Sequence, residues 1–178
     1  MPNFLENALA QLQTASGRVV LREIRGTEFV SVSGAELLDQ VARARAYLRG
    51  AGLQAGDRCA LLGPNSIRWA AIDLALMAEG IVVVPLYSRQ APAELAAMMK
   101  DCTPSLLIAG DATIGESVAQ VWSEVPPRAT FDEILQSAPM QKGIAGPPNP
   151  RQSEDLARSS TPPGLPANPR ASASARRI

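Results

Sequence analysis

The sequence predicts an α/β fold in which helices cover a mostly parallel β-sheet, and three observations support this. Two short apolar runs, residues 59–62 and 81–86, are typical of strands, and an apolar helical stretch ending at Gly80 separates them. Uninterrupted apolar strands are typical of parallel sheets covered on both faces. Strands that alternate with helices favour crossover connections. The composition changes after residue 138, so we expect one domain over residues 1–138.

The segments before this sheet carry clear local signals. Apolar residues at helical spacing predict an amphipathic helix over residues 3–15, and alternation on both sides of Gly26 predicts a β-hairpin over residues 18–32. Ser33 begins the next helix, because Ser33 and Glu36 have the spacing of a capping box. The apolar stripe of that helix is Leu37, Val41, Ala44 and Leu48.

The turn at residues 63–66 follows the first apolar strand and has two interpretations. It lacks the G-x-G-x-x-G and G-x-x-x-x-G-K-[ST] patterns of phosphate cradles, so a strand-to-helix turn capped by Asn65 is favoured. The helix runs to Glu79, and Asp73 within it is expected to be a buried or partly buried, hydrogen-bonded carboxylate rather than a catalytic one. Further elements are expected as a helix over 92–101, a strand over 105–109 and short helices over 116–122 and 131–137.

Composition excludes several classes of function. The 17 basic and 17 acidic residues give no argument for a nucleic-acid or anionic-membrane partner. The absence of His excludes a His base, a Ser-His-Asp triad and His metal ligands, and no metal site is expected. Cys59 and Cys102 are expected to be reduced core thiols rather than a disulfide or zinc ligands. Neither a secretory signal nor a transmembrane segment is recognisable, so the expected location is cytoplasmic.

Residues 139–178 differ in kind from the rest of the chain. They are rich in Gly, Pro, Ser, Ala and Arg, contain few large apolar residues, and hold six basic residues against two acidic ones. Such a segment cannot bury enough apolar surface to offset an ordering cost of roughly 1 to 2 kcal/mol per residue. We therefore expect a linker over residues 139–157 and a disordered C-terminal tail over residues 158–178.

Three blocks of sequence carry a resemblance to a known family. In order, they are residues 33–48 (SGAELLDQVARARAYL), 53–69 (LQAGDRCALLGPNSIRW) and 74–87 (LALMAEGIVVVPLY). Together they resemble the N-terminal segment of AMP-forming acyl-CoA synthetases, the adenylate-forming ligases that include long-chain fatty-acid-CoA ligases. The resemblance implies the N-terminal portion of the large domain of such an enzyme. For a full-length member it implies ATP, Mg and CoA, and a fatty or other hydrophobic carboxylic acid as the substrate.

The chemistry of that family depends on a phosphate loop of the form YTSGT-x-G-x-PKG, whose backbone donors and Lys hold ATP. The loop does not occur in this sequence, so no catalytic or cofactor-binding residue is expected in the chain. The resemblance places Arg68, Trp69 and Tyr87 near the substrate side of the domain, which makes them candidates for an acyl pocket. Core packing and surface charge are the favoured roles of these side chains.

The residues where the loop is due suggest a change of reading frame. Family members commonly approach the loop with Asp-Leu-Ala and an apolar strand, and residues 155–157 are Asp-Leu-Ala. Residues 158–172 can be encoded so that their nucleotides, read one base out of phase, spell IIYTSGTSGEPKGV. For example, Ser160 as TCT before Thr161 as ACA gives TAC, a tyrosine. The hypothesis is that one nucleotide was lost near codon 158 and that residues 158–178 are out-of-frame translation rather than a nucleic-acid-binding arm.

Two hypotheses of function follow from the sequence. The first is a truncated ATP-dependent acyl-CoA synthetase that is inactive as this 178-residue chain. The alternative is a non-catalytic α/β domain that binds or regulates a partner ligase. In both cases apolar surface left uncovered by the missing portion is expected to favour self-association.

Overall fold

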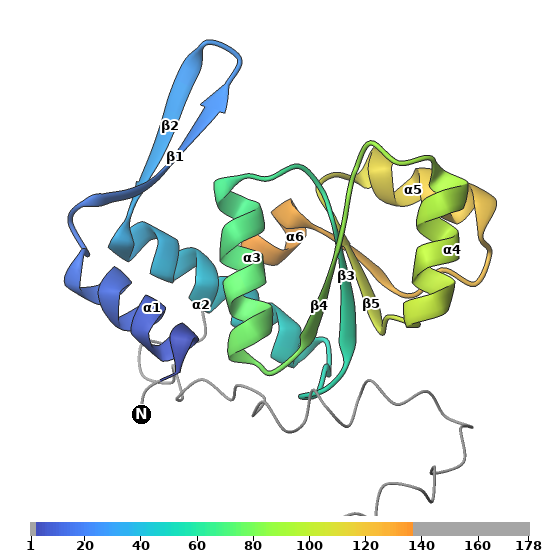
Figure 1. Ribbon diagram of the computed structural model, residues 1–178, viewed down its shortest axis with the longest axis horizontal. Helices are drawn as coiled ribbons and strands as arrows, with labels where there is room; N and C mark the ends of the chain where they lie inside the picture. The colour runs from blue at the N-terminus through green and yellow to red at the C-terminus, as the bar shows by residue number, and fades with distance from the viewer. Residues whose placement is uncertain (1–2, 137–178) are drawn as a thin grey trace, which may run out of the picture.

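The computed structural model describes residues 3–136, which form an α/β body and a projecting hairpin (Figure 1). The helices are α1 (Phe4–Thr14), α2 (Gly34–Gly50), α3 (Ile67–Ala78), α4 (Pro92–Cys102), α5 (Ala112–Val121) and α6 (Phe131–Gln136). The strands are β1 (Val19–Arg25), β2 (Glu28–Ser33), β3 (Arg58–Leu62), β4 (Val82–Leu86), β5 (Leu106–Ala109) and β6 (Arg128–Thr130). This order confirms the predicted alternation of strands and helices after a hairpin.

Strands β3 to β6 form one parallel sheet in the order β4-β3-β5-β6. In the interior strand β3, Ala60 lies opposite Val84 of β4 and Leu107 of β5. The chain leaves β3 through α3 to reach β4 on one side, and it then crosses through α4 to β5 on the other side. The connection that follows β3 leads to β4, and the connection that follows β5 leads the other way to β6, so the two diverge between β3 and β5. In open α/β sheets, ligands bind beyond the carboxyl ends of the strands at such a point.

Helices cover both faces of the sheet: α2, α3 and α6 lie on one face, and α4 and α5 on the other (Figure 1). Successive side chains of a strand point to opposite faces. In β3, Cys59 and Leu61 join the cluster beneath α2 and α3, whereas Ala60 and Leu62 join the cluster beneath α4 and α5. All four are fully buried, so the prediction of a strand covered on both faces is confirmed for β3.

Strand β4 departs from that prediction because it forms an edge of the sheet. Val82, Val83 and Val84 are only partly buried, and Pro85 is exposed. The Val82 amide donates to the carbonyl of Asp57, just before β3, at 2.8 Å. Alternation along the strand then places the amide position of residue 85 on the open side. Proline has no N–H, so it leaves no unpaired donor at this position of the edge.

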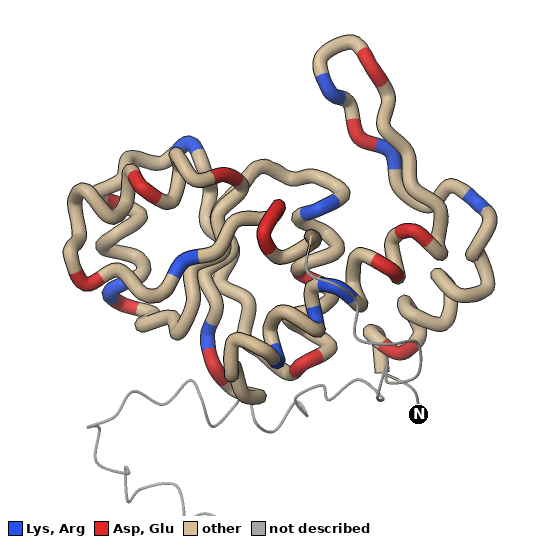
Figure 2. The backbone as a smooth tube through the Cα atoms, turned by 180° about the vertical axis from the view of Figure 1, so that it is seen from behind, with Lys and Arg blue, Asp and Glu red and all other residues tan. Residues whose placement is uncertain are grey.

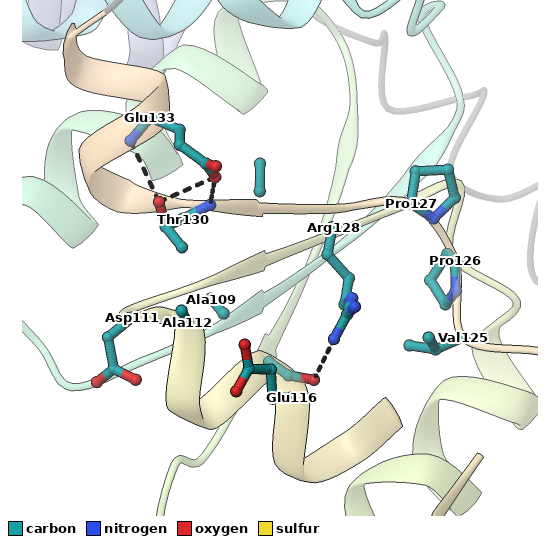
Figure 3. A pocket seen from close by; sticks show the side chains of 12 residues that line it. Ala109, Asp111, Ala112, Glu116, Val125, Pro126, Pro127, Arg128, Thr130 and Glu133 are labelled. Atoms are coloured by element: carbon teal, nitrogen blue, oxygen red, sulfur yellow. Dashed lines mark hydrogen bonds between the residues drawn. The ribbon is translucent and has the colours of Figure 1, made fainter. Parts of the chain in front are cut away.

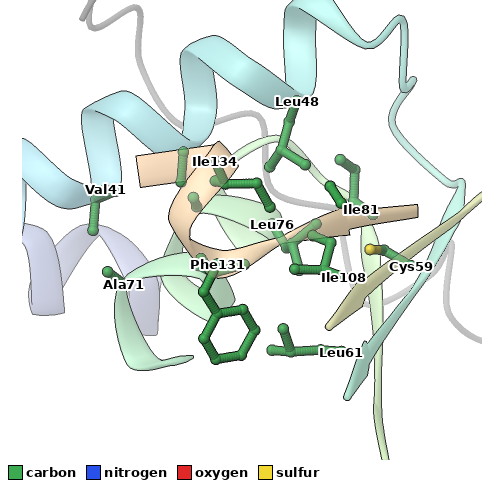
Figure 4. Close-up of a cluster of buried hydrophobic side chains, with 14 of the residues drawn as sticks. Val41, Leu48, Cys59, Leu61, Ala71, Leu76, Ile81, Ile108, Phe131 and Ile134 are labelled. Carbon is green, nitrogen blue, oxygen red and sulfur yellow. The ribbon is translucent and has the colours of Figure 1, made fainter. Parts of the chain in front are cut away.

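The larger hydrophobic cluster lies between the sheet and helices α2, α3 and α6 (Figure 4). The predicted apolar stripe of α2 contributes to it in full, because Leu37, Val41, Ala44 and Leu48 are all buried. Helix α6 adds Phe131 and Ile134, which are also fully buried. The smaller cluster on the other face joins α4 and α5 to the sheet.

Both N-terminal helices begin with a capping box. At α2, the Ser33 amide donates to Glu36 Oε2 at 2.7 Å, and the Glu36 amide donates to Ser33 Oγ at 3.3 Å. At α1, Asn3 and Glu6 exchange the equivalent pair of bonds, both at 2.9 Å. The predicted box at Ser33 is confirmed, and it satisfies amide donors that the helix itself cannot pair.

An ion-pair cluster joins α2 to the end of α3. Glu79 accepts hydrogen bonds from Arg45 Nε at 2.6 Å and from Arg49 Nε at 2.9 Å. Burial alone would raise the pKa of Glu79, but the bonds from Arg49 and Arg45 outweigh burial and hold that pKa below its ordinary value. Because Arg45 is buried, the carboxylate of Glu79 offsets part of the cost of removing the Arg45 charge from water.

Strands β1 and β2 form the predicted hairpin, which projects beyond the body in Figure 1. It turns at Gly26, whose φ of 62° lies in the left-handed region that favours glycine. One face lies against the body, where Leu21, Val30 and Val32 pack on the larger cluster. Figure 2 shows acidic and basic residues interspersed along both the hairpin and the body.

Two elements differ from the sequence prediction. Helix α5 begins well before residue 116, because Asp111 Oδ1 accepts the Ile114 amide at 2.9 Å and caps the helix there. Strand β6 was not predicted, since three residues after two prolines show no alternation. The predicted disorder of residues 139–178 and its division into linker and tail lie outside the described residues.

Candidate functional site

The carboxyl ends of β3 and β5, where ligands of such sheets bind, are filled by the protein itself. A Cβ added to Gly63, directly after β3, would lie 2.7 Å from the Phe131 ring and 3.3 Å from the Cα of Gly110, which follows β5. The Gly110 amide donates to the Leu62 carbonyl at 2.8 Å. Gly63 is thus required for a close approach of two turns and a ring rather than for a phosphate.

The turn at residues 63–66 confirms the strand-to-helix interpretation but corrects the cap. Ser66, not Asn65, caps α3, because Ser66 Oγ accepts the Trp69 amide at 3.1 Å. The Ile67 amide donates to Glu23 Oε2 of β1 at 2.8 Å. Two of the amides that a phosphate would use at this helix start, those of Ile67 and Trp69, are therefore already paired with groups of the chain.

The three candidates for the acyl pocket have different surroundings. Arg68 Nη1 donates to Asp132 Oδ1 at the start of α6. Trp69 is partly buried and packs against the larger cluster, whereas Tyr87, directly after β4, is 62% exposed. Their assignment to an acyl pocket stays a prediction.

A groove of about 600 Å³ lies between α5 and the open edge of β6 (Figure 3). Helix α5 contributes Ala112, Gly115 and Glu116 to its lining, and β6 with its flanking residues contributes Pro126, Arg128 and Thr130. Arg68, Trp69 and Tyr87 are not among its lining residues. No sequence pattern predicts this groove, because it depends on strand β6, which was not predicted.

Most polar groups of the groove are engaged within the chain. Arg128 Nη1 donates to the Gly115 carbonyl at 3.1 Å. Glu133 Oε2 accepts the Thr130 amide at 2.7 Å and the Thr130 hydroxyl at 2.9 Å, and these bonds lower the pKa of Glu133. Within residues 3–136, no group of three His, Cys, Asp or Glu side chains is placed to hold a metal ion.

The remaining buried titratable groups show no catalytic arrangement. Burial raises the pKa of Asp73, but no described residue donates a hydrogen bond to it, so the predicted hydrogen bond is not formed among the described residues. Both cysteines are free, as predicted. Burial raises the pKa of Cys59 to about 12, and Cys102 is half-buried. Between residues 3 and 136, no helix has the length and apolar character needed to cross a bilayer.

A family model described as AMP-binding enzyme matches residues 9–172. The chain belongs to the AMP-binding enzyme family. The matched range includes the hairpin and the whole parallel sheet. It confirms the family inferred from the three sequence blocks.

Two curated relatives of this AMP-binding chain are acyl-CoA ligases. It is 28% identical over 120 residues to long-chain-fatty-acid–CoA ligase FadD15 of Mycobacterium tuberculosis, covering 67% of this chain and 20% of the ligase. It is 34% identical over 91 residues to the mitochondrial medium-chain acyl-CoA ligase ACSF2 of Homo sapiens, covering 50% of this chain and 15% of that ligase. The chain therefore spans a fifth or less of the length of these relatives.

Solved structures share the fold of this AMP-binding chain. A benzoate CoA ligase from Burkholderia xenovorans LB400 has a TM-score of 0.66 at 21% identity, covering 82% of this chain and 30% of that chain. VinN also has a TM-score of 0.66, at 24% identity, covering 74% of this chain and 34% of that chain. The predicted fold class, an α/β fold with a mostly parallel sheet covered by helices, is confirmed.

Proposed function

We propose that this chain is the N-terminal portion of an ATP-dependent acyl-CoA synthetase and that it is inactive as a 178-residue polypeptide. The main support is the continuity of the family match. The first block forms α2, the second forms β3 and the start of α3, and the third forms the end of α3 and β4. Strands β3 and β4 are neighbours in one sheet, and the family match includes all three blocks. The chain carries the architecture of the ligase without its phosphate loop.

The complete enzyme is proposed to act in two steps. The carboxylate of the acid attacks the α-phosphorus of ATP, which forms an acyl-adenylate and releases pyrophosphate. The thiol of CoA then displaces AMP to form the thioester. A fatty or other hydrophobic acid is the proposed substrate, because the relatives are named long-chain-fatty-acid and medium-chain acyl-CoA ligases. The cytoplasm is the proposed location.

The described residues do not fit an ATP and Mg²⁺ site. The Ile67 and Trp69 amides at the start of α3 are paired with Glu23 and Ser66, and Glu133 accepts the Thr130 amide. No group of three possible ligands is available among residues 3–136. We therefore assign no step of the reaction to the described residues.

The proposal locates the missing loop in the shifted reading frame of residues 158–172. Restoring one nucleotide near codon 158 replaces this stretch by one residue and then IIYTSGTSGEPKGV, so a single residue separates the peptide from the Asp-Leu-Ala of residues 155–157. The backbone donors and the Lys of that peptide are the groups that hold phosphates in such loops. These residues lie outside the described part of the chain, so this step rests on the sequence.

Pyrophosphate release tests the proposed function. The 178-residue chain and a chain with the restored frame and its downstream sequence are each incubated with ATP, Mg²⁺ and short-, medium- or long-chain acids. We expect release by the frame-restored chain alone, and replacement of its loop Lys by Ala is expected to abolish that release. Release by the 178-residue chain would contradict the proposed inactivity. A frame-restored chain that is folded but releases nothing with any acid would contradict the reaction.

The exposed apolar pair on the hairpin favours a second candidate function. Ile24 and Phe29 are 71% and 72% exposed, which suits a non-catalytic domain that binds a partner ligase or a second copy of itself. Light scattering of the 178-residue chain, alone and mixed with the frame-restored ligase, tests this function. A complex between the two chains would support it, and two non-interacting monomers would contradict it.

A further inference from the structure

The hairpin has two faces of different character. Cross-strand partners share a face, so Glu23 and Val30 lie on the face that packs on the body, together with the neighbouring pair Leu21 and Val32. The opposite face, which we call the outer hairpin face, consists of the pairs Ile24–Phe29 and Arg22–Ser31, and all four residues are exposed.

Firm contacts hold the hairpin to the body, so the outer face is presented in a defined orientation. Val32 is buried in the larger cluster, and Glu23 Oε2 accepts the Ile67 amide of α3 at 2.8 Å. Arg25 Nε donates to Glu23 Oε1 at 2.7 Å and holds this carboxylate in place. The inner face therefore packs on the body from Leu21 to Glu23 and from Val30 to Val32, whereas nothing among residues 3–136 covers the outer face.

The chemistry of the outer hairpin face defines the surface that would fit it. Ile24 and Phe29 offer two adjacent large apolar side chains, and exposed apolar patches of this kind mark interaction sites. Arg22, on the same face, makes no ion pair with any described residue. A complementary surface is apolar at its centre and carries a carboxylate opposite Arg22.

The length of the relatives indicates what covers this face. FadD15 matches this chain over 20% of its own length, and the benzoate CoA ligase over 30%. The family match includes the hairpin, so a complete ligase holds the same hairpin beside a much longer downstream polypeptide. Resting on the proposed function, we propose that the outer hairpin face docks the downstream part of the same ligase polypeptide.

Site-specific thiol labelling of intact chains tests this proposal. Ser31→Cys places a thiol on the outer hairpin face without altering Ile24 or Phe29, and Ser123→Cys, also at an exposed serine, is the matched control. Cys59 is fully buried and Cys102 is half-buried, and burial raises the pKa of both thiols, so we expect both to react more slowly than an exposed thiol. Each substitution is made in the 178-residue chain and in the frame-restored chain, and a maleimide labels both folded proteins.

We expect equal labelling of the two thiols in the 178-residue chain and roughly tenfold slower labelling of residue 31 alone in the frame-restored chain. Adding Ile24→Ser and Phe29→Ser to the frame-restored chain is expected to return residue 31 to the control rate. Equal labelling of residue 31 in both chains would overturn the proposal. Protection that appears in the 178-residue chain and grows with its concentration would also overturn it, in favour of a second copy.

The same samples separate this inference from the proposed function. Protection of residue 31 without pyrophosphate release would leave the docking surface standing and refute the reaction. Pyrophosphate release without protection would leave the reaction standing and refute the docking surface.

Discussion

The parallel-sheet body and the β1–β2 hairpin are stabilised in different ways. The body buries both faces of its sheet under helices, through two hydrophobic clusters. The hairpin buries one face, contributes Val32 to the core, and is fixed to α3 by the carboxylate of Glu23. An isolated two-stranded hairpin is marginally stable in water. The hairpin therefore depends on the body on its inner side, and no other part of residues 3–136 covers its outer side.

The largest expected effect comes from Phe131, whose ring is buried in the larger hydrophobic cluster of the body. Phe131→Ala removes a fully buried ring and should lower the free energy of unfolding by about 3 to 5 kcal/mol. Phe29→Ala, the control on the hairpin, removes an exposed ring and should cost less than about 0.5 kcal/mol. Urea unfolding of the 178-residue chain measures both values. Equal losses would refute the distinction between body and hairpin.

The next effect comes from the ion-pair cluster of the body. Glu79→Ala leaves the buried Arg45 without this carboxylate and should cost about 3 kcal/mol. Asp39→Ala breaks the exposed pair with Arg43 and should cost less than about 1 kcal/mol. A loss at residue 79 no larger than at residue 39 would contradict the structural role of the cluster.

The cluster also predicts a dependence of stability on pH. The pKa of Glu79 is held below the ordinary value of 4.5, so its stabilising contribution is fully present above that pH. It is lost as the pH falls through the lower pKa of the folded state. Glu79→Gln should therefore flatten the acid limb of the stability curve measured by urea unfolding. An unchanged acid limb would show that other groups control it.

A smaller effect is expected where the hairpin meets the body. Glu23→Gln weakens the charge-assisted bond to the Ile67 amide and should cost about 1 kcal/mol, or about fivefold faster hydrogen exchange in β1 and β2. The bond from Arg25 is the main reason why the pKa of Glu23 lies below its ordinary value, so the same loosening should appear as the pH falls through that pKa. Glu28→Gln, at an exposed position of the same hairpin, should leave exchange unchanged. Similar exchange in both variants would remove Glu23 as the anchor.

An effect of similar size distinguishes the two possible caps of α3. Ser66→Ala removes the side chain that accepts the Trp69 amide and should cost about 1 kcal/mol. Asn65→Ala, one residue earlier, should change the thermal unfolding midpoint little, because its side chain makes no capping bond. A larger loss at Asn65 would restore the cap predicted from the sequence.

Features with local signals could be predicted from the sequence, whereas features set by distant partners could not. The capping box at Ser33, the turn at Gly26 and the apolar stripe of α2 each depend on neighbouring residues alone. The pairing of Arg45 with Glu79 joins positions far apart in the chain, so no pattern of neighbouring residues predicts it. Strand β6 exists because β5 pairs with it, and the groove beside it follows from that pairing.

The choice between Asn65 and Ser66 shows the limit of residue preference. Both residue types are good caps, and the extended backbone at Ser66, with φ of −154° and ψ of 168°, decides between them. The acyl-pocket role of Arg68, Trp69 and Tyr87 stays a prediction. These three side chains do not line the groove beside β6, so the described residues do not test that role.

The nucleotide sequence of codons 157–172 tests most directly the central claim, that the phosphate loop of the ligase is encoded here in another frame. The claim predicts that Ser160 ends in T, so that TAC follows for the loop tyrosine. It also predicts that Pro169 ends in A before an AGG codon for Arg170, so that AAG follows for the loop lysine. A gene whose shifted frame spells IIYTSGTSGEPKGV and continues open would confirm the claim. A CGN codon for Arg170, or a stop codon within the shifted stretch, would contradict it.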